Sequence, residues 1–307
     1  MNSIYFLGEC MVELRQTNRT TMAQSFAGDV YNSAVYIKRC FPNIHSAMLS
    51  VVGHDQLSHN MLHAFASEQL DTQLVLHHDN KAPGMYLVET DDTGERSFTY
   101  WRNESAARTV VSFLNEQTMQ VLAKADYLFF SGISLAVIEQ DARALFWQKV
   151  LWLKQQGVKI IFDPNFRARL WHNNQEAKVQ FEQAFNHSDI VLPGIEDFEA
   201  LYGFTSAIEI IDFLAPFNID ETVIKNGPES VVTVQNNQQQ THAITPVDNV
   251  VDTTSAGDAF NGVYLGARFS QQSIKASVQL AAKAAGIVIQ NPGAITPRHI
   301  FLQGMKA

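Results

Sequence analysis

Cysteine is scarce in this chain of 307 residues: Cys10 and Cys40 are the only two, and there is no CxxC pair. A disulfide framework is therefore not expected, and a reducing, cytoplasmic compartment fits. Basic residues are also few, because 22 Lys and Arg stand against 31 Asp and Glu and give a net charge of -9. Nucleic acids and anionic membranes select basic surfaces, so we expect neither as a partner.

Long apolar runs are missing as well. The most apolar stretch, residues 125–138, contains Asp126 and Gly132 and is too short to cross a bilayer. The first residues lack a basic region, and Glu9 interrupts their short apolar run, so no signal peptide is expected. A content of 46% hydrophobic and 17% charged residues indicates a folded chain of one large or two modest domains.

Short apolar runs recur along the chain, and many end in a polar or glycine-containing turn. They lie at residues 4–7, 47–52, 127–130, 160–162, 190–192 and 222–224. Runs of this length are typical of buried parallel strands, and helical patterns such as residues 57–68 and 142–155 fill most gaps. We therefore predict an α/β fold with a mostly parallel central sheet flanked by helices, which binds ligands beyond the carboxyl ends of its strands.

One region breaks this alternation. Residues 84–90 and 95–102 are extended runs rich in β-branched and aromatic residues, and residues 91–94 between them indicate a hairpin turn. With residues 11–15 they predict a small β-sheet lid; a decorated sheet edge is the alternative. The predicted division is a lid of residues 11–32 and 83–105 on a body of residues 1–10, 33–82 and 106–307. A polar cluster at residues 236–240 indicates a further hairpin tip.

The motif that points to chemistry is DTTSAGDAF, residues 252–260, which follows an extended stretch at 245–251 and precedes a helix of small residues. A glycine turn that opens a helix leaves unpaired N–H groups at the positive end of the helix dipole, and this favours an anion. Asp258 stands among these amides, where a bound anion repels it. We therefore predict that Asp258 accepts the proton of a hydroxyl that attacks phosphorus. Helix capping is the alternative.

DTTSAGDAF resembles the DTxGAGD signature of the ribokinase-like (PfkB) carbohydrate kinases. The resemblance covers essentially the whole chain, and it is closest to those members that phosphorylate 2-keto-3-deoxygluconate. The segments that carry it are GECMVEL from Gly8, GDVYNSAVYIKR from Gly28, GMYLVETDDTGERSFTYWRNESAA from Gly84 and DPNFRARLW from Asp163. It implies transfer of a phosphoryl group from ATP to the terminal hydroxyl of this sugar acid, with Mg²⁺ required and K⁺ as a candidate second ion.

The resemblance also implies roles for individual residues. Asp258 corresponds to the catalytic base, and the amides of Ala256, Gly257 and Asp258 correspond to the anion hole for the transferred phosphate. The implied nucleotide site consists of Asn165, Lys225, Gly227, Ser230 and Gly257, with Asp197 contacting Mg²⁺ through water and Asp252 contacting a monovalent cation. The sequence departs from the family pattern at Ser255 and Ser230, which replace glycines, and at residues 194–197, which replace an NxxE motif.

Two arginines indicate an acidic substrate. Arg102 ends the second hairpin run and Arg167 follows a strand, and a guanidinium binds a carboxylate through two charge-assisted hydrogen bonds. The full predicted sugar site is Gly28, Asp29, Asn32, Tyr86, Tyr100, Arg102 and Arg167. A surface pair of Arg102 with Glu104 and simple hairpin packing of Tyr86 are the alternatives. Two other functions stay open: a kinase of a neutral sugar such as fructose or ribose, and an inactive sugar-binding homologue. A homo-oligomer is compatible with either.

Overall fold

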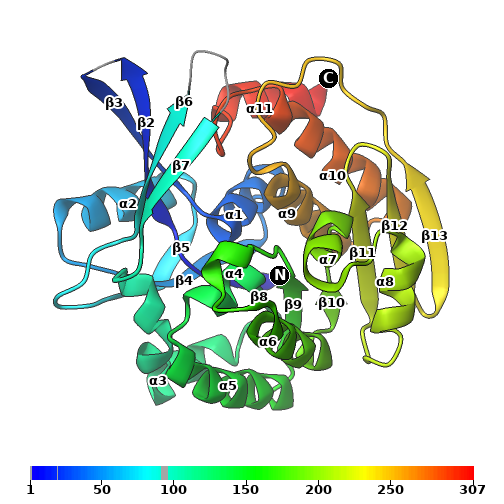
Figure 1. Ribbon diagram of the computed structural model, residues 1–307, viewed down its shortest axis with the longest axis horizontal. Coiled ribbons are helices and arrows are strands. Elements are labelled where there is room, and N and C mark those ends of the chain that lie inside the picture. The colour runs from blue at the N-terminus through cyan, green and yellow to red at the C-terminus, as the bar shows by residue number, and fades with distance from the viewer. Residues whose placement is uncertain (1, 19, 91–95) are drawn as a thin grey trace.

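A computed structural model describes residues 2–18, 20–90 and 96–307, so the predicted turn at residues 91–94 lies outside the described part. A nine-stranded sheet forms the centre of the body, in the order β13-β12-β11-β10-β9-β8-β1-β4-β5 (Figure 1). Its strands are β1 (Ser3–Leu7), β4 (His45–Val52), β5 (Asp71–His77), β8 (Tyr127–Ser131), β9 (Lys159–Asp163), β10 (Ile190–Val191), β11 (Glu221–Asn226), β12 (Ser230–Gln235) and β13 (Gln238–Ala243). The seven strands from β5 to β11 are parallel and the last two are antiparallel, which confirms the predicted mostly parallel sheet.

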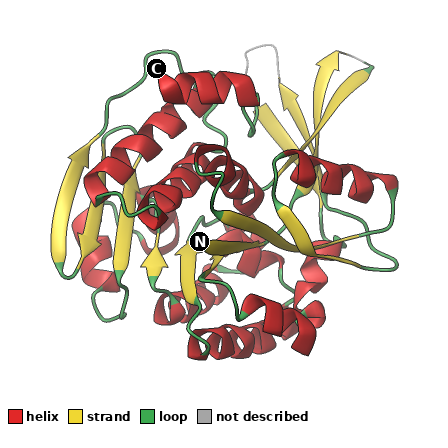
Figure 2. Cartoon of the chain, turned by 180° about the vertical axis from the view of Figure 1, so that it is seen from behind, coloured by secondary structure: helices red, strands yellow, loops and turns green. Residues whose placement is uncertain are grey.

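Helices cover both faces of this sheet (Figure 2). One face carries α3 (Glu116–Leu122), α5 (Arg143–Gln155), α6 (Asn174–His187), α7 (Ile195–Tyr202), α8 (Ala207–Leu214) and the 3₁₀ segment η1 (Ala106–Phe113). The other carries α1 (Asp29–Cys40), α2 (Gln56–Ser67), α9 (Ala256–Phe269), α10 (Ile274–Ile289) and α11 (Arg298–Lys306). Short segments α4 (Gly132–Val137), η2 (Gln140–Ala142) and η3 (Ala168–Leu170) complete the body.

Strand alternation separates two hydrophobic cores. Tyr5 and Leu7 of β1 belong to one buried cluster, whereas Ile4 and Phe6 belong to the cluster on the opposite face. Successive side chains of a strand point to opposite faces, so a run that is apolar throughout supplies both cores at once. The uninterrupted apolar runs of the sequence follow from this burial on both sides.

The lid is a separate four-stranded sheet, at the upper left of Figure 1. It consists of β2 (Met11–Asn18), β3 (Thr21–Ala27), β6 (Met85–Thr90) and β7 (Arg96–Trp101), in the order β3-β2-β6-β7. A separate sheet confirms the predicted lid and not the alternative of a decorated sheet edge. Residues 29–32 already belong to α1, and the domain limits 11–32 and 83–105 stay a prediction.

Two local expectations need correction. Residues 245–251, predicted as extended, lie outside any strand, because β13 ends at Ala243. Pro246 has no N–H to donate, and Val250 and Val251 are 53% and 60% exposed, so this segment buries no face. The predicted hairpin tip is confirmed but shorter: Asn236 and Asn237 have positive φ values of 51° and 59°, and residues 238–240 belong to β13. In the part of the chain that the structure describes, no helix is long and apolar enough to cross a membrane.

Candidate active site

A buried polar triangle lies where β9 and β11 end at the carboxyl edge of the sheet. The Lys225 ammonium donates to Asp163 Oδ1 at 3.3 Å and to Asn261 Oδ1 at 3.1 Å. The Asn261 amide in turn donates to Asp163 Oδ2 at 2.8 Å. Because Asp163 and Asn261 are 4% and 0% exposed, their contacts fix the direction of the Lys225 side chain. This places the predicted nucleotide-binding lysine beside α9.

Asp258 lies in the first turn of α9, one turn before Asn261. Its Oδ2 atom accepts a hydrogen bond of 2.8 Å from the Asn32 amide, and Asn32 Oδ1 accepts one of 3.3 Å from the Gly28 N–H. A Cβ atom on Gly28 would lie 2.3 Å from the Glu9 carbonyl oxygen, so only glycine fits there. The structure thus brings the predicted base Asp258 together with Asn32 and Gly28 of the predicted sugar site.

Burial raises the pKa of Asp258 to about 7, and the negative charges of Asp29 and Asp163 act in the same direction. The hydrogen bond from Asn32 opposes this rise because it stabilises the ionised carboxylate. A carboxylate that titrates near neutral pH is suited to accept a proton from a hydroxyl group.

Asp29 lies at the start of α1, where the lid strand β3 enters the body. Its Oδ2 atom accepts a hydrogen bond of 3.0 Å from the Asn165 amide. Burial raises the pKa of Asp29 as well, and the charge of Asp163 adds to this rise. Asn165 has a positive φ of 30°, and its side chain points to the sugar side through this bond. The structure therefore places this predicted nucleotide residue next to a predicted sugar residue.

The first turn of α9 borders open space at Gly257. A Cβ atom added to Gly257 would meet nothing within 4 Å, and the residue is exposed. The first N–H groups of an α-helix have no partner within the helix, so those of Gly257 and Asp258 are available to an anion. The third predicted member differs, because the Ala256 N–H donates to the Thr253 carbonyl at 3.3 Å.

Asp197, in the first turn of α7, contacts Arg167 of the loop after β9. Asp197 Oδ1 accepts a hydrogen bond of 2.8 Å from the Phe166 N–H and lies 3.5 Å from Arg167 Nη1. Burial raises the pKa of Asp197 to about 6. Among the described residues no three Asp, Glu, His or Cys side chains converge on one point.

The lid presents its predicted tyrosines as a pair. Tyr86 and Tyr100 stand opposite each other in the β6–β7 register, with ring centroids 5.6 Å apart. The Tyr86 hydroxyl donates to the buried Glu13 carboxylate. Arg102, 8% exposed, forms a buried ion pair with Glu9 and not with Glu104, which pairs with Lys81.

Arg102 keeps an unused donor in this buried position. Its Nη2 atom pairs with Glu9, whereas its Nε atom completes no hydrogen bond within the described part of the chain. A buried guanidinium with a spare N–H group remains able to bind a carboxylate.

The remaining predicted residues lie at the margins of this region. Gly227 occupies the turn between β11 and β12 with a positive φ of 48°, and Ser230 begins β12 opposite Asn226. The Asp252 carboxylate accepts hydrogen bonds from the N–H groups of Thr254 and Gly293 at 2.8 and 2.9 Å. Asp252 therefore joins the loop before α9 to the loop after α10.

Sequence reasoning did not assign Glu9, Glu13, Asp163, Asn261 and Arg169 to the site. Two of them carried a readable signal: Asp163 follows an apolar strand, and Asn261 lies one helical turn after Asp258. Glu13 lies in β2 and Glu9 lies just before it, and strand register decides which residues of other strands they contact. Nothing in the linear sequence indicates that register.

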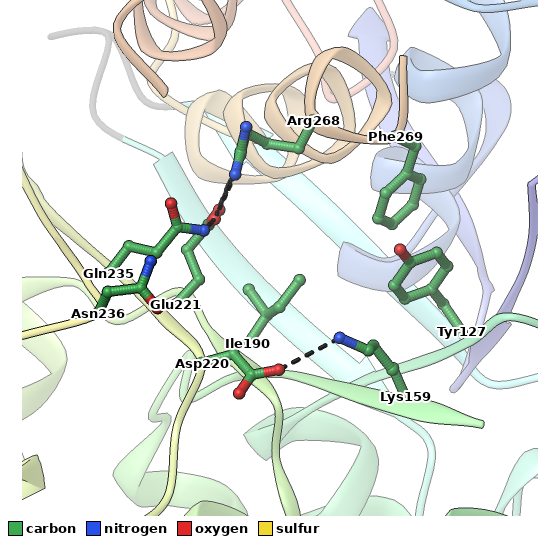
Figure 3. A pocket seen from close by; sticks show the side chains of 9 residues that line it. All are labelled: Tyr127, Lys159, Ile190, Asp220, Glu221, Gln235, Asn236, Arg268 and Phe269. Carbon is green, nitrogen blue, oxygen red and sulfur yellow. Dashed lines mark hydrogen bonds and ion pairs between the residues drawn. The ribbon is translucent and has the colours of Figure 1, made fainter. Parts of the chain in front are cut away.

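A second hollow, of about 380 Å³, lies at the opposite, amino edge of the sheet (Figure 3). Its charged groups pair with each other, Lys159 with Asp220 and Arg268 with Glu221, as the dashed lines show. Because its four charged side chains neutralise one another, the candidate active site is the region around Asp258.

The chain is similar to known proteins over nearly its whole length. The family model described as pfkB family carbohydrate kinase matches residues 1–300. The chain is 35% identical over 300 residues to 2-dehydro-3-deoxygluconokinase of Haemophilus influenzae, covering 96% of each. It is 36% identical over 307 residues to 2-dehydro-3-deoxygluconokinase of Escherichia coli K12, covering 96% of this chain and 97% of that one.

The fold also matches solved structures. A fructokinase of Xylella fastidiosa with bound ATP superimposes with a TM-score of 0.83 at 20% identity, over 99% of this chain and 98% of that chain. This likeness and the family match confirm the ribokinase-like fold that the sequence motifs implied. The chain belongs to the PfkB family of carbohydrate kinases.

Proposed function

We propose that this kinase transfers a phosphoryl group from ATP to the terminal hydroxyl of 2-keto-3-deoxygluconate and forms the 6-phosphate. The observation that carries the proposal is the position of Asp258, which Asn32 holds beside the open amides of Gly257 and Asp258. The two relatives named 2-dehydro-3-deoxygluconokinase support the choice of substrate.

In this reaction Asp258 accepts the proton of the attacking hydroxyl. The Gly257 and Asp258 amides stabilise the negative charge of the transferred phosphoryl group, because donors fixed in advance need no reorganisation during the reaction. Lys225, held by Asp163 and Asn261, extends positive charge toward the nucleotide, with Asn165, Gly227 and Ser230 completing its site. The lid excludes water, which competes as a nucleophile.

Two ion contacts belong to the proposal. Asp197, half-buried in the first turn of α7, would hold Mg²⁺ through water, and bound Mg²⁺ neutralises the phosphate oxygens. Asp252 would contact a monovalent cation, as the family resemblance of the DTTSAGDAF motif implies.

The substrate carboxylate would lie between Arg102 and Arg167. The Arg167 side chain is 48% exposed, and Arg102 has the spare buried Nε donor described above. Gly28, Asp29, Asn32, Tyr86 and Tyr100 would bind the hydroxyl groups. A neutral sugar offers no partner to two guanidinium groups, which favours a sugar acid.

A coupled ADP-release assay over sugars and sugar acids tests the proposal. We expect turnover of 2-keto-3-deoxygluconate and little of fructose or ribose. A hydrogen bond to a charged group contributes about 1.5–3 kcal/mol, so Arg167→Ala should lower kcat/KM for the acid roughly 10–150-fold. It should affect a neutral analogue much less. Arg298→Ala, an exposed arginine on α11, is the matched control and should leave kcat/KM unchanged.

The same assay separates the rival functions. Preferred turnover of fructose or ribose would identify a neutral-sugar kinase, and no ADP release with any sugar would identify an inactive homologue. Arg102→Ala requires a parallel stability measurement, because it also leaves the buried Glu9 carboxylate without its partner.

A further inference from the structure

Arg169 of the body contacts Tyr100 of the lid. Its Nη2 atom donates a hydrogen bond of 2.5 Å to the Tyr100 hydroxyl, and its guanidinium carbon lies 4.0 Å from the centroid of the same ring. One side chain therefore makes both a hydrogen bond and a cation–π contact with one partner. Each contact fixes a different direction of the ring, so together they restrain its orientation.

Tyr100 lies on β7, the edge strand of the lid sheet. The next residue, Trp101, points to the other face and is 56% exposed. Among the described residues, Met11, Ala27, Tyr86 and Val88 of the lid form a small buried cluster with Ala294 of the loop after α10, and Tyr100 packs against it. An outer strand with so little buried apolar surface depends on side-chain contacts for its position.

From Tyr100 a chain of contacts crosses all four lid strands. The Tyr100 ring of β7 stacks on Tyr86 of β6, and the Tyr86 hydroxyl donates to Glu13 of β2. Glu13 Oε1 accepts a hydrogen bond of 2.8 Å from Ser25 of β3. Arg169 thus contacts the outer end of a series that joins every strand of the sheet.

The other end of the contact belongs to the active-site loop. Arg169 follows Asn165 and Phe166 in the chain. The Asn165 side chain donates to Asp29, and the Phe166 N–H donates to Asp197. A displacement of this loop would therefore reach the lid through Arg169. Arg167, two residues earlier, turns back to the Phe166 carbonyl and makes no such contact with Tyr100 among the bonds of the described residues.

We propose that Arg169 is a positioning residue that orients Tyr100 and, through it, holds the lid sheet over the active site. Arg169 itself touches no reacting group. The part of this proposal that concerns substrate affinity rests on the proposed function, whereas the part that concerns the lid does not.

Hydrogen exchange of the protein without any ligand tests the lid directly. A cation–π contact contributes about 0.5–2 kcal/mol, so Arg169→Ala should speed amide exchange in β6 and β7 roughly 2–30-fold. Exchange in the β12–β13 hairpin should not change. Lys178→Ala is the matched control, because Lys178 lies 5.2 Å from the Tyr202 ring within the body and has no link to the lid.

Two conservative variants keep the test decisive. Tyr100→Phe removes the hydrogen bond and keeps the ring, and Arg169→Lys keeps a cation and loses the planar fork, so both should give intermediate rates. Wild-type exchange in Arg169→Ala, or faster exchange spread equally over all strands, would overturn the proposal. The first outcome would show that the Arg169–Tyr100 contact does not restrain the lid, and the second would show a general loss of stability.

Kinetics provide the second readout. If the lid is less often in place, the apparent affinity for the sugar falls in proportion while the saturated rate is kept. Arg169→Ala should therefore raise KM for the sugar roughly 2–30-fold and change kcat less than about threefold. A fall in kcat with unchanged KM would contradict a positioning role. If the wild type phosphorylates no sugar, the proposed function fails, and the exchange experiment still decides the role of Arg169.

Discussion

Asn32 donates a hydrogen bond of 2.8 Å to Asp258, although 226 positions separate the two residues in the chain. The bond is made because α1 and α9 lie side by side (Figure 1). A Cβ atom on Gly262 of α9 would lie only 2.3 Å from the Ser33 carbonyl oxygen of α1, so the close approach of the helices requires glycine. The small residues of α9 therefore bring the predicted base to the residue that orients it.

Replacing this base should abolish most of the activity and leave the fold intact. Asp258→Asn keeps the size of the side chain but cannot accept the proton. General bases contribute about 10²–10⁴-fold, so kcat should fall at least roughly 100-fold. Thermal unfolding and ATP affinity, measured alongside, should stay close to wild type. A variant that retains more than about a tenth of the wild-type kcat would remove Asp258 from this role.

The pH dependence of the reaction should follow the titration of Asp258. Because its pKa is raised to about 7, kcat/KM should fall as the pH drops below that value and the carboxylate is protonated. Asp29→Asn removes a negative charge that raises this pKa, so the acid limb of the profile should move to lower pH. A limb that stays in place in Asp29→Asn would show that Asp29 does not act on the base.

Much of the fold could be predicted from the sequence because burial on both sides leaves uninterrupted apolar runs. The runs at residues 4–7 and 160–162 are strands of the sheet for this reason. Strands β3 and β13 were not predicted, since Thr21–Ala27 is mostly exposed and Gln238–Ala243 is both mostly exposed and polar. Their pairing with a neighbouring strand, and not their own composition, makes them strands.

The site was predictable where the chemistry is local. Asp258 and its neighbouring amides belong to one helix start, so a motif of nine residues contains them. The partner of Arg102 was not predictable, because Glu9 is the nearest carboxylate in space and Glu104 is the nearest in sequence. Long-range pairs of this kind depend on how lid and body meet, which local patterns do not indicate.

Replacing Ser255 by glycine should make the folded protein more stable. It precedes α9 with a positive φ of 65°, and its hydroxyl has no hydrogen-bond partner of good geometry in the described residues, although it lies near enough to Asp258 to lower the pKa of that carboxylate. The left-handed conformation costs an L-residue about 1–2 kcal/mol, and part of this is offset because glycine is more flexible when unfolded. Ser255→Gly should therefore raise the free energy of unfolding by about 0.5–1 kcal/mol in urea titrations. A loss of stability would mean that the serine side chain contributes a contact that outweighs its strain.

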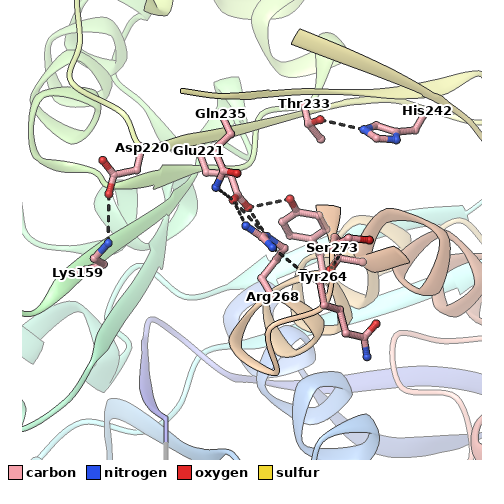
Figure 4. Close-up of polar contacts among 11 residues, drawn as sticks. Lys159, Asp220, Glu221, Thr233, Gln235, His242, Tyr264, Arg268 and Ser273 are labelled. Atoms are coloured by element: carbon pink, nitrogen blue, oxygen red, sulfur yellow. Dashed lines mark hydrogen bonds and ion pairs between the residues drawn. The ribbon is translucent and has the colours of Figure 1, made fainter. Parts of the chain in front are cut away.

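Glu221 should be essential for stability and dispensable for catalysis. Its carboxylate, at the start of β11, accepts hydrogen bonds from Tyr264, Arg268 and Gln235 at 2.7, 2.8 and 2.7 Å (Figure 4). Removing one partner of a buried ion pair costs about 3–5 kcal/mol, and partial exposure of Arg268 places the expected loss for Glu221→Ala near 3 kcal/mol. Denaturant unfolding measures this loss.

The neighbouring ion pair supplies the control. Lys159 and Asp220 border the same hollow, but their side chains are 52% and 63% exposed, so Asp220→Ala should cost no more than about 1 kcal/mol. Both variants should keep the wild-type kcat per folded molecule, because β11 separates Glu221 at its start from Lys225 near its end. Should Glu221→Ala fail to fold, Glu221→Gln keeps an acceptor and should lose less stability. Equal losses in Glu221→Ala and Asp220→Ala would show that burial of the Glu221 cluster adds nothing to its contribution.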